Sequence, residues 1–450
     1  MIVMKFGGTS VGSADAIKRV ADIIKSRLDQ KPVVVVSAVG GLTDKLVELT
    51  RAACSGNHTE IDRLKNLFLD THQKLIQDLS LSEPVLLSAF ESGANMLESA
   101  VQMLEQAGEY SDELYDSLVS IGEFLSSNIL AAVLQRNGID SQMHDSRQLM
   151  ITDSEFGSAR PLMQESRVRV QKNLKPAAEK HVPVLQGFVG SDTAGRTTTL
   201  GRGGSDYSAT LFASMLGAHT VEIWSDVDGV LSADPSLVPS AQRIRHMTFQ
   251  EAAELAYFGA KVIHPSTLLP AVEDNIRVII LNSMNPEFKG TIISNTGEDR
   301  GEEDGRVKSI AYKENLTVIT VISSRMLMSH GFMASLFGVF QKYRTAVDLV
   351  ATSEVSVSIT IDDTRHLKDI VRELEAFAAV EIETEKAVVC CVGESLKGTP
   401  GLAAQILGHL EHTKIYAISL GGSDINLSFV IEDAELPRVI NRLHEQFFSK

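Results

Sequence analysis

Residues 2–10 read IVMKFGGTS, an apolar run that leads directly into two glycines and two hydroxyl residues. Ile2–Phe6 has the β-branched and aromatic composition of a buried strand. The later run Ala14–Arg27 repeats apolar residues at the spacing of an amphipathic helix. A strand, a glycine turn and a helix in this order are typical of an α/β domain.

The same alternation of strand and helix continues through the first two thirds of the chain. It predicts an α/β domain with a mostly parallel sheet and helices on both of its faces. We expect Ser205 and Asp206 to supply the N-cap of one of these helices. The further predicted strands are Pro32–Ser37, Val182–Phe188, Thr220–Trp224 and Arg277–Leu281, and the further helices are Asp62–Leu79, Leu86–Ala107 and Ser205–Leu216.

Length and composition exclude several classes of protein. The chain has 450 residues, of which 44% are hydrophobic, and at about 100–200 residues per domain it predicts two or three domains. Its net charge of -16 repels the phosphate backbone of nucleic acids. Three cysteines are too few for a disulfide framework, and CxxC and HExxH motifs are absent. We find no targeting peptide and no apolar run near the about 20 residues that span a bilayer, so we expect a soluble cytoplasmic protein without a membrane or nucleic-acid partner.

The last third of the chain contains an internal repeat. Gly331 aligns with Gly401 and Ser358 with Ser428 in one ungapped register. Each copy reads strand, loop, helix, strand, strand, helix, which predicts two small α+β units. The Gly- and acid-rich stretch before them has no apolar face to bury and predicts a linker. We therefore expect a first domain over 1–296, a linker over 297–305 and a C-terminal region over 306–450.

Two glycine-rich segments are candidates for an anion site. Gly7 and Gly8 let the backbone approach a ligand closely, and Lys5 can bring its ammonium to the same phosphate. In the second segment, TTTLGRGGSD over 197–206, the guanidinium of Arg202 suits a carboxylate or a phosphate. On chemistry alone, Asp206 is either only an N-cap or an N-cap with a role in an active site.

Two later segments place turn residues at the ends of predicted elements. WSDVDGV over 224–230 and ADP over 233–235 are ordinary turn formers, or else a nucleotide loop at the carboxyl end of a parallel strand. In FGAKVIHP over 258–265, Lys261 is a partner of the helix C-terminus or a phosphate ligand, and its position alone favours the first. We expect His264 to be structural. A GxxxxGK[ST] loop and the paired HRD and DFG motifs are absent, which disfavours the two commonest phosphotransfer folds.

Taken together, these segments resemble the amino-acid kinase superfamily and, within it, the aspartokinases. The C-terminal repeat resembles the paired ACT domains of that family, with units at about 314–385 and 386–450 and the strand 306–313 completing the second. The resemblance covers essentially the whole chain and leaves no residues for a fused homoserine dehydrogenase. The matching strings are KFGGTS (5–10), SA (37–38), GLT (41–43), SIGE (120–123), TTTLGRGGSD (197–206), DVDGV (226–230), DP (234–235) and FGAKVIHP (258–265).

The resemblance implies transfer of the γ-phosphoryl group of ATP to the β-carboxylate of L-aspartate. The product, 4-phospho-L-aspartate, would feed lysine, threonine and methionine biosynthesis. Mg²⁺ would bridge the nucleotide phosphates, with no metal held mainly by the protein. An aspartate carboxylate with a reference pKa of ~3.9 is already ionised at neutral pH, so no general base is required. Catalysis then depends on positioning and on neutralising the charge of the transferring group.

The resemblance also assigns roles to residues by motif position. Lys5 and the amides of Gly7 and Gly8 would stabilise the transferring phosphoryl group, and Asp206 would orient Lys5. Glu123 would pair with the substrate ammonium, and Arg202 would hold a substrate carboxylate. Many family members carry Tyr and Arg at the positions of Leu231 and Ser236, and Ser236 cannot replace a guanidinium. The implied catalytic residues are Lys5, Gly7, Gly8 and Asp206; the aspartate-binding residues are Ser37, Thr43, Glu123, Arg202 and Ser205; and the nucleotide-binding residues are Lys5, Gly8, Ser225, Asp226, Leu231 and Lys261.

The first repeat further resembles the effector site of lysine-inhibited members. Asp348 and Glu354 would attract the ammonium of L-lysine, although without the resemblance both would be interpreted as ordinary surface carboxylates. A homodimer through the ACT domains is implied, with a tetramer as the alternative. The implied effector residues are Met326, Ser329, Phe332, Met333, Val347, Asp348, Thr352, Ser353 and Glu354.

Two rival functions stay open at this point. One is another amino-acid or carbamate kinase of the same fold, and the other is a non-catalytic amino-acid sensor. Glu123, Arg202 and the paired C-terminal units weigh against the first, and the intact Lys5, Arg202 and Asp206 weigh against the second.

Overall fold

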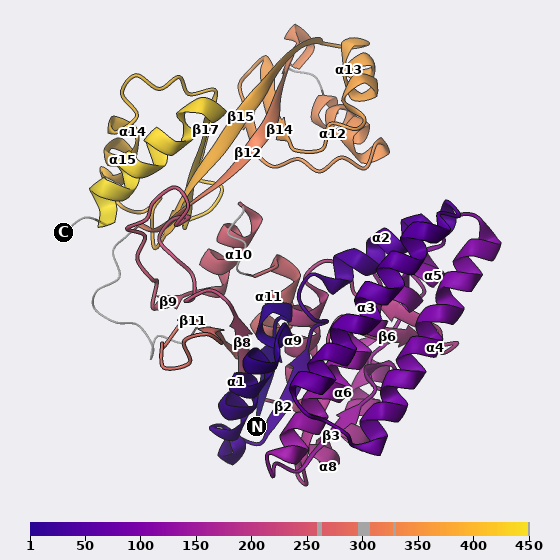
Figure 1. The fold of residues 1–450 in the computed structure, drawn as a ribbon. Coiled ribbons are helices and arrows are strands. Elements are labelled where there is room, and N and C mark those ends of the chain that lie inside the picture. The colour runs from indigo at the N-terminus through magenta and orange to yellow at the C-terminus, as the bar shows by residue number, and fades with distance from the viewer. Residues whose placement is uncertain (259–262, 296–306, 327–329, 449–450) are drawn as a thin grey trace. The chain divides into compact units, whose positions relative to one another are not determined.

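The computed structural model describes residues 1–258, 263–295, 307–326 and 330–448 (Figure 1). The chain divides into two compact units that do not follow sequence order. The first unit holds residues 1–230, 245–249 and 262–299, and the second holds 231–244, 250–261 and 300–450. Two segments that we expected in the first domain thus belong by their contacts to the second unit. The predicted linker over 297–305 lies outside the described residues.

An eight-stranded sheet forms the centre of the first unit. Its neighbours pair in parallel from β3 through β10, and β10 and β11 pair antiparallel. The five strands predicted for the first domain are β1, β2, β5, β8 and β10 of this parallel part, so the predicted fold class is confirmed. The order across the sheet is β3 (Ser141–His144), β5 (Val182–Gln186), β2 (Pro32–Val36), β1 (Ile2–Phe6), β8 (Thr220–Ser225), β10 (Arg277–Asn282), β11 (Thr291–Ile293) and β9 (His246–Met247). A smaller sheet consists of β4 (Ile151–Thr152), β6 (Val189–Asp192) and β7 (Thr197–Thr199).

Helices pack against both faces of the large sheet (Figure 1). The side chains of Ile2, Met4 and Phe6 lie in one core with α1 (Ala14–Lys25) and α6 (Ile121–Arg136). Because side chains alternate along a strand, Lys5 points to the opposite face, where α9 (Gly204–Leu216) contacts β1 and α11 (Pro265–Glu273) contacts α9. The remaining helices of this unit are α2 (Leu42–Cys54), α3 (His58–Asp78), α4 (Pro84–Ala107), α5 (Asp112–Val119), α7 (Met163–Arg169) and α8 (Lys175–Ala178).

The start of α9 differs from its prediction. The N-cap residue is Gly203, whose φ of 72° is left-handed, and the helix begins at Gly204. Glycine adopts this conformation without the steric cost that a Cβ would add. The predicted N-cap at Ser205 and Asp206 is therefore wrong, since both residues lie inside the first helical turn. Their side chains are not used to cap the helix.

A second sequence expectation, that no apolar run approaches membrane length, also fails. Among the described residues, one helical stretch, Asp112–Arg136, is long and apolar enough to span a bilayer by length and composition. It comprises α5 and α6, which follow one another at Ser120. Of its most apolar window, 83% is buried inside the protein. The apolar composition therefore reflects a helix in the core of the first unit.

The second unit is built on a six-stranded antiparallel sheet with two long central strands. The second half of the strand β12 and the first half of β15 form one end of the sheet, and their other halves form the other end. Each end has its own hydrophobic core and two helices, α12 (Phe332–Lys342) and α13 (Leu367–Glu375) or α14 (Leu402–Gly408) and α15 (Leu436–Phe448). The two ends are the two copies of the sequence repeat. The strand order is β13 (Val350–Thr352), β14 (Ser356–Ile361), β12 (Val307–Ile322), β15 (Ala379–Gly393), β17 (Asn426–Glu432) and β16 (Ala417–Leu420).

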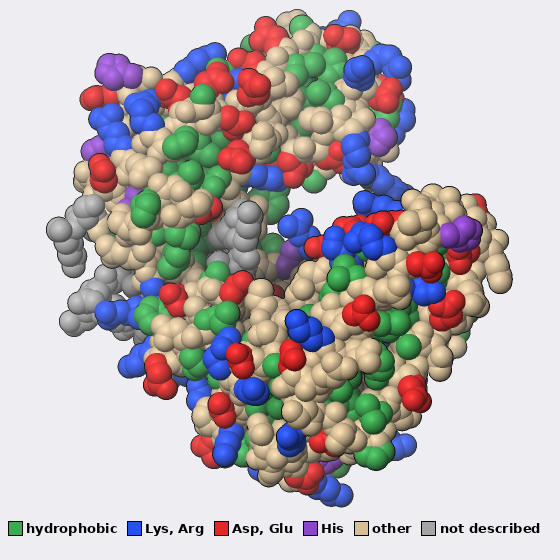
Figure 2. All heavy atoms as spheres, in the orientation of Figure 1, with side chains coloured by type: hydrophobic (Ala, Val, Ile, Leu, Met, Phe, Trp, Pro, Cys, Tyr) green, Lys and Arg blue, Asp and Glu red, His purple; other side chains and the backbone are tan. Residues whose placement is uncertain are grey.

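Two segments from the middle of the chain join this second unit. Ala233 and Val238 are buried in the core of the second repeat, which explains why 231–244 belongs there. The helix α10 (Phe249–Tyr257) is tied to the strands of the repeats by an ion pair from Glu251 to Lys308 and a hydrogen bond from Asn426 to Glu254. Acidic and basic side chains are mixed over the visible face of both units (Figure 2).

Candidate active site

A pocket of about 520 Å³ lies in the first unit, lined by residues of β1, α2, α5, α6 and α9 and of the loops between elements. It gathers Lys5, Asp206 and all five residues that the sequence assigns to aspartate binding. These residues come from five different parts of the chain, so the fold brings them together. The full lining is Lys5, Ser37, Thr43, Asp44, Val47, Tyr115, Glu123, Gly157, Phe188, Gly201, Arg202, Gly203, Gly204, Ser205 and Asp206.

An ion pair joins Lys5 and Asp206 at one side of this pocket. The Lys5 Nζ lies 2.5 Å from the Asp206 Oδ1, and the two side chains are only 10% and 17% exposed. Lys5 faces α9 because of its place on β1, and Asp206 is available because Gly203 caps the helix. Both interpretations that the sequence left open for Asp206 made it an N-cap, and this part of both is wrong because Gly203 occupies that position.

The glycine turn after β1 brings two chain segments into close contact. A Cβ on Gly8 would lie 2.8 Å from the Ala38 carbonyl oxygen, so only glycine fits there without a shift. The Gly7 N–H donates to the Trp224 carbonyl at 3.0 Å, and this amide is therefore not directed at a phosphoryl group as we expected. Gly8 begins the 3-10 turn Gly8–Val11, where the first amides have no acceptor within the helix. Of the two predicted amides, only that of Gly8 remains suited to an anion.

Glu123 supplies a buried carboxyl group to the pocket from the first turn of α6. The residue is 3% exposed, and burial raises its pKa to about 8, although the amides of Ala38 and Glu123 and the charge of Lys5 lower it. Among the described residues, its Oε2 has no hydrogen-bond partner. A buried carboxyl group of this kind gains a charge partner when an ammonium enters.

Arg202 brings an exposed guanidinium to the same pocket, and the described residues provide no ion-pair partner for it. The loop that carries it is held tightly at its glycines. A Cβ on Gly203 would lie 2.6 Å from the Cβ of His264. His264 itself caps α11, and its Nδ1 lies 2.7 Å from the Ser266 Oγ, so its role is structural, as predicted.

The pocket also contains residues that sequence reasoning missed, above all Phe188. Its φ of 68° is rare for an aromatic residue, and its amide donates to the Ser208 Oγ at 2.8 Å. A Cβ on Gly204 would lie 2.6 Å from the Phe188 ring, which explains the glycine at the first position of α9. The available signal was the position of Phe188 just after β5, at the carboxyl end of a parallel strand, where ligands bind in open α/β sheets.

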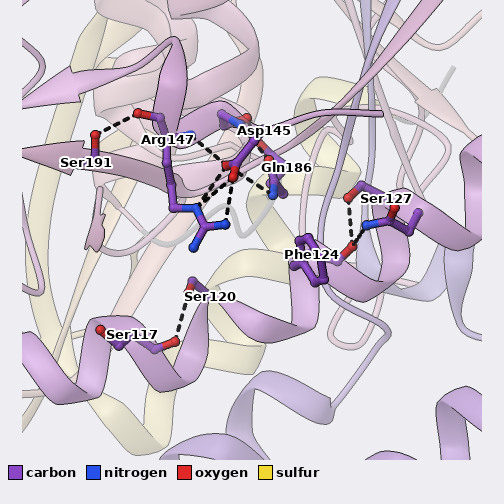
Figure 3. Close-up of polar contacts among 10 residues, drawn as sticks. Ser117, Ser120, Phe124, Ser127, Asp145, Arg147, Gln186 and Ser191 are labelled. Carbon is purple, nitrogen blue, oxygen red and sulfur yellow. Dashed lines mark hydrogen bonds and ion pairs between the residues drawn. The ribbon is translucent and has the colours of Figure 1, made fainter. Parts of the chain in front are cut away.

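A polar cluster fixes the loops that follow β3 and β5 (Figure 3). The Arg147 guanidinium donates to both oxygens of Asp145, at 2.7 to 3.0 Å. The Gln186 Oε1 accepts from the Ser146 amide at 2.6 Å, and the Ser191 hydroxyl donates to the Arg147 carbonyl at 2.6 Å. The cluster ties β5 and β6 together on either side of Phe188.

The predicted nucleotide-binding residues are divided between the two units, and one of them lies outside the described residues. Ser225 and Asp226 follow β8 in the first unit, where the Ser225 hydroxyl donates to the Asp226 Oδ1 at 3.2 Å. Leu231 belongs to the second unit, and Lys261 lies outside the described residues. No group of three or more His, Cys, Asp or Glu side chains suited to a metal ion occurs among the described residues.

The predicted effector residues lie in the first repeat of the second unit. Asp348 is 2% exposed at its side chain, so it is not an ordinary surface carboxylate. Its Oδ1 accepts from the Lys313 Nζ at 2.7 Å and from the Tyr257 hydroxyl at 2.9 Å. Met326, Phe332 and Val347 pack against the core of the repeat, Met333 is partly exposed, and Thr352, Ser353 and Glu354 are exposed at the hairpin between β13 and β14, whereas Ser329 lies outside the described residues.

Comparisons with known proteins give similarities over the whole chain. The model of the amino acid kinase family matches residues 1–282, and a model of the ACT domain matches residues 389–447. The chain is 37% identical to the lysine-sensitive aspartokinase 3 of Escherichia coli, covering 100% of this chain and 99% of that protein. It is 36% identical to the chloroplastic aspartokinase 1 of Arabidopsis thaliana, covering 99% of this chain and 80% of that protein.

Solved structures of one relative are similar throughout. Escherichia coli aspartokinase III in complex with aspartate and ADP, described as the R-state, has a TM-score of 0.87 at 36% identity, with 100% of both chains covered. The same enzyme with lysine and aspartate, described as the T-state, has a TM-score of 0.80 over the same share of both chains.

Proposed function

As a member of the amino-acid kinase family and, within it, of the aspartokinases, this chain is an ATP-dependent aspartate kinase, and we propose that its aspartate site is the pocket beside Lys5. One observation carries the proposal. A single pocket contains the guanidinium of Arg202, the buried carboxyl group of Glu123 and the ammonium of Lys5. Aspartate has one ammonium and two carboxylates, which complement these three groups.

The pocket suits a reaction that needs no general base. The β-carboxylate of aspartate is ionised at neutral pH and is itself the nucleophile. Lys5 neutralises charge on the transferring phosphoryl group, and the Gly8 amide adds a donor at the start of its helical turn. Asp206, at 2.5 Å, holds the Lys5 ammonium in place. Glu123 and Arg202 orient the substrate by its ammonium and one carboxylate.

Mg²⁺ would be carried by the phosphates of ATP. Mg²⁺ usually keeps several waters and binds through the phosphates of a nucleotide together with one or two carboxylates. When bound, the ion would neutralise phosphate charge. Ser225, Asp226, Leu231 and Lys261 remain our candidates for nucleotide contacts. Ser236 donates to Asp234 at 2.6 Å and serves a turn in this chain.

We further propose L-lysine as an effector at the first repeat. The E. coli relative is named as lysine-sensitive and has been solved with lysine, which supports the proposal. Asp348 and Glu354 offer two carboxylates, whereas the second repeat has Ile418 and Asp424 at the corresponding positions. The exposed apolar residues Val350 on β13 and Ile418 on β16 fit a homodimer through the ACT units, with a tetramer as the alternative.

A coupled assay of ADP release tests the proposed substrate. Aspartate, glutamate and acetylglutamate are offered separately with ATP and Mg²⁺, and we expect turnover with aspartate alone. Turnover with glutamate or acetylglutamate instead would favour another kinase of the same fold. The absence of ADP release with all three would favour a sensor.

A further inference from the structure

A fully buried carboxylate stands behind the wall of the proposed aspartate pocket. Asp116 on α5 is 0% exposed. Its Oδ2 accepts from the Gly157 amide at 2.9 Å and from the Thr199 amide at 2.8 Å, and its Oδ1 accepts from the Thr199 hydroxyl at 2.6 Å. Burial raises the pKa of Asp116 to about 6, although these hydrogen bonds lower it. No cation pairs with Asp116 among the described residues, so its polar partners are those two residues.

The two partners of Asp116 belong to two segments of the pocket wall. Gly157 lines the pocket itself, and Thr199 ends β7, from which the chain continues through Gly201 to Arg202. The segments also contact each other directly. The Ala159 amide donates to the Thr199 carbonyl at 2.8 Å, and a Cβ on Gly201 would lie 3.2 Å from the Gly157 carbonyl oxygen.

We propose that Asp116 is a positioning residue for aspartate: it fixes the Arg202 loop relative to Gly157 by accepting hydrogen bonds from the backbone of both segments. The proposal rests on the proposed role of Arg202. Asp116 does not line the pocket, so it acts only through its two partners. In a reaction that depends on positioning, a displacement of about 1 Å costs on the order of a hundredfold in rate.

The geometry predicts which substitution preserves the arrangement. In Asp116→Asn, the amide oxygen can accept both backbone amides, and the amide nitrogen can donate to the Thr199 hydroxyl, which then acts as an acceptor. In Asp116→Ala, the two amides and the hydroxyl lose their acceptor inside the protein. Asparagine should therefore keep the loop in place, and alanine should release it.

Asp192 provides a matched control on the same hairpin. Its side chain is 1% exposed, and it accepts from the amides of Ala194 and Arg196 at 3.0 and 2.9 Å, at the end of the hairpin away from Arg202. Asp192 also accepts from the Ser154 hydroxyl at 3.1 Å and pairs with the Arg196 guanidinium. Asp192→Ala thus removes a buried carboxylate and these contacts from the hairpin, and it leaves the hydrogen bonds from Thr199 and Gly157 to Asp116 in place. The Asp192→Ala variant therefore distinguishes a general disturbance of the hairpin from a displacement of Arg202.

The test measures KM for aspartate, KM for ATP and kcat in the full chain. We expect Asp116→Ala to raise the KM for aspartate by about tenfold or more, with the KM for ATP within about twofold. Asp116→Asn and Asp192→Ala should keep the KM for aspartate within about twofold of the wild type. If Asp116→Ala does not fold, Thr199→Val removes only the hydroxyl donor and should raise the same KM by about threefold.

Three results would overturn the proposal. The first is an unchanged KM for aspartate in Asp116→Ala. The second is an equal rise of the KM for aspartate and the KM for ATP in that variant. The third is a KM for aspartate that rises as much in Asp192→Ala as in Asp116→Ala. Failure of the proposed function is distinguishable, because it would appear as a KM for aspartate that does not respond to substitution of Arg202 or Glu123.

Discussion

Each unit contains a lysine that forms an ion pair with a carboxylate, and the surroundings of the two ion pairs differ. In the first unit, Lys5 pairs with Asp206 and with no other carboxylate of the described residues, and a pocket opens beside the pair. In the second unit, the Lys313 Nζ lies 2.7 Å from Asp348 and 2.7 Å from Asp362, and 5.7 Å from the centre of the Tyr257 ring. Burial lowers the pKa of Lys313, but the two carboxylates outweigh it and raise the pKa.

The difference shows that an ion pair alone does not identify a catalytic cation. Lys313 is fixed on two sides by anions, so its charge is already neutralised within the unit. Lys5 forms an ion pair with one carboxylate, that of Asp206, and faces a pocket with space for a charged ligand. The comparison predicts that Lys5 acts on a ligand and that Lys313 organises the second unit around Asp348.

The largest expected effect is on kcat, and it should differ between substitutions of these two lysines. Lys5→Ala should lower kcat by about a thousandfold or more, because its charge is directed at the transferring phosphoryl group. Lys313→Ala should keep kcat without lysine within about threefold, because its charge is used inside the second unit. Steady-state kinetics on both purified variants, with circular dichroism to confirm folding, provides the measurement. Wild-type turnover in folded Lys5→Ala would contradict the assignment of the glycine turn.

A second prediction concerns the pH dependence of aspartate binding at Glu123. With a pKa of about 8 in the empty pocket, Glu123 is mostly protonated at pH 7, and an ammonium favours its ionised form. Binding should therefore release a proton, and the KM for aspartate should fall as the pH rises from about 6.5 to 8. Glu123→Gln should raise the KM for aspartate by about tenfold or more and remove this pH dependence.

The control for this prediction is another carboxylate of the same pocket. Asp44 lines the pocket but is exposed, so Asp44→Asn should retain the wild-type pH profile. If the KM values for aspartate and ATP rise together in Glu123→Gln, Glu123 acts on the loops of the pocket and not on the substrate ammonium.

The sequence predicted the parallel strands closely, because buried strands and glycine turns are local signals. The predicted strand Thr220–Trp224, for example, differs from β8 by one residue. Asp116 and Lys313 could not be found in this way, since their partners lie far away in sequence. The same holds for 231–244, whose apolar residues pack into a core built from residues after 306. The predicted N-cap of α9 was wrong because Gly203 adopts a left-handed conformation and caps the helix. Ser205 and Asp206, which are common N-cap residue types, follow it and favoured the wrong position.

A third prediction tests whether the exposed carboxylate of Glu354 in the second unit binds L-lysine as an effector. Glu354 is exposed, whereas Asp348 is already bound by Lys313 and Tyr257. Glu354→Ala should raise the lysine concentration for half-inhibition by about five- to tenfold and leave activity without lysine unchanged. Asp424→Ala, at the corresponding position of the second repeat, is the matched control and should leave inhibition as in the wild type. Separate titrations with lysine, threonine and methionine come first, since a flat lysine curve would refute the effector and leave the kinase assignment intact.

The smallest expected effect concerns the second donor to Asp348. Lys313 and Tyr257 both bind the Oδ1 of Asp348, and its buried Oδ2 has no partner among the described residues. That free oxygen is the one suited to an effector ammonium, and the two donors to Oδ1 hold it in orientation. Tyr257→Phe removes one donor and keeps the ring beside Lys313.

We therefore expect Tyr257→Phe to weaken lysine inhibition by about two- to fivefold, the usual effect of losing one partly exposed hydrogen bond. Its kcat and both KM values without lysine should match the wild type, because the hydrogen bonds of the hydroxyl to the described residues go to Val347 and Asp348 of the first repeat. Tyr343→Phe is the control, since it removes a tyrosine hydroxyl of the same repeat that donates to Glu373 at 2.6 Å. Equal lysine curves for the wild type and Tyr257→Phe would mean that Lys313 alone orients Asp348. A lower kcat without lysine would instead place Tyr257 in the kinase reaction, and Lys313 and Lys5 would then no longer differ as the comparison requires.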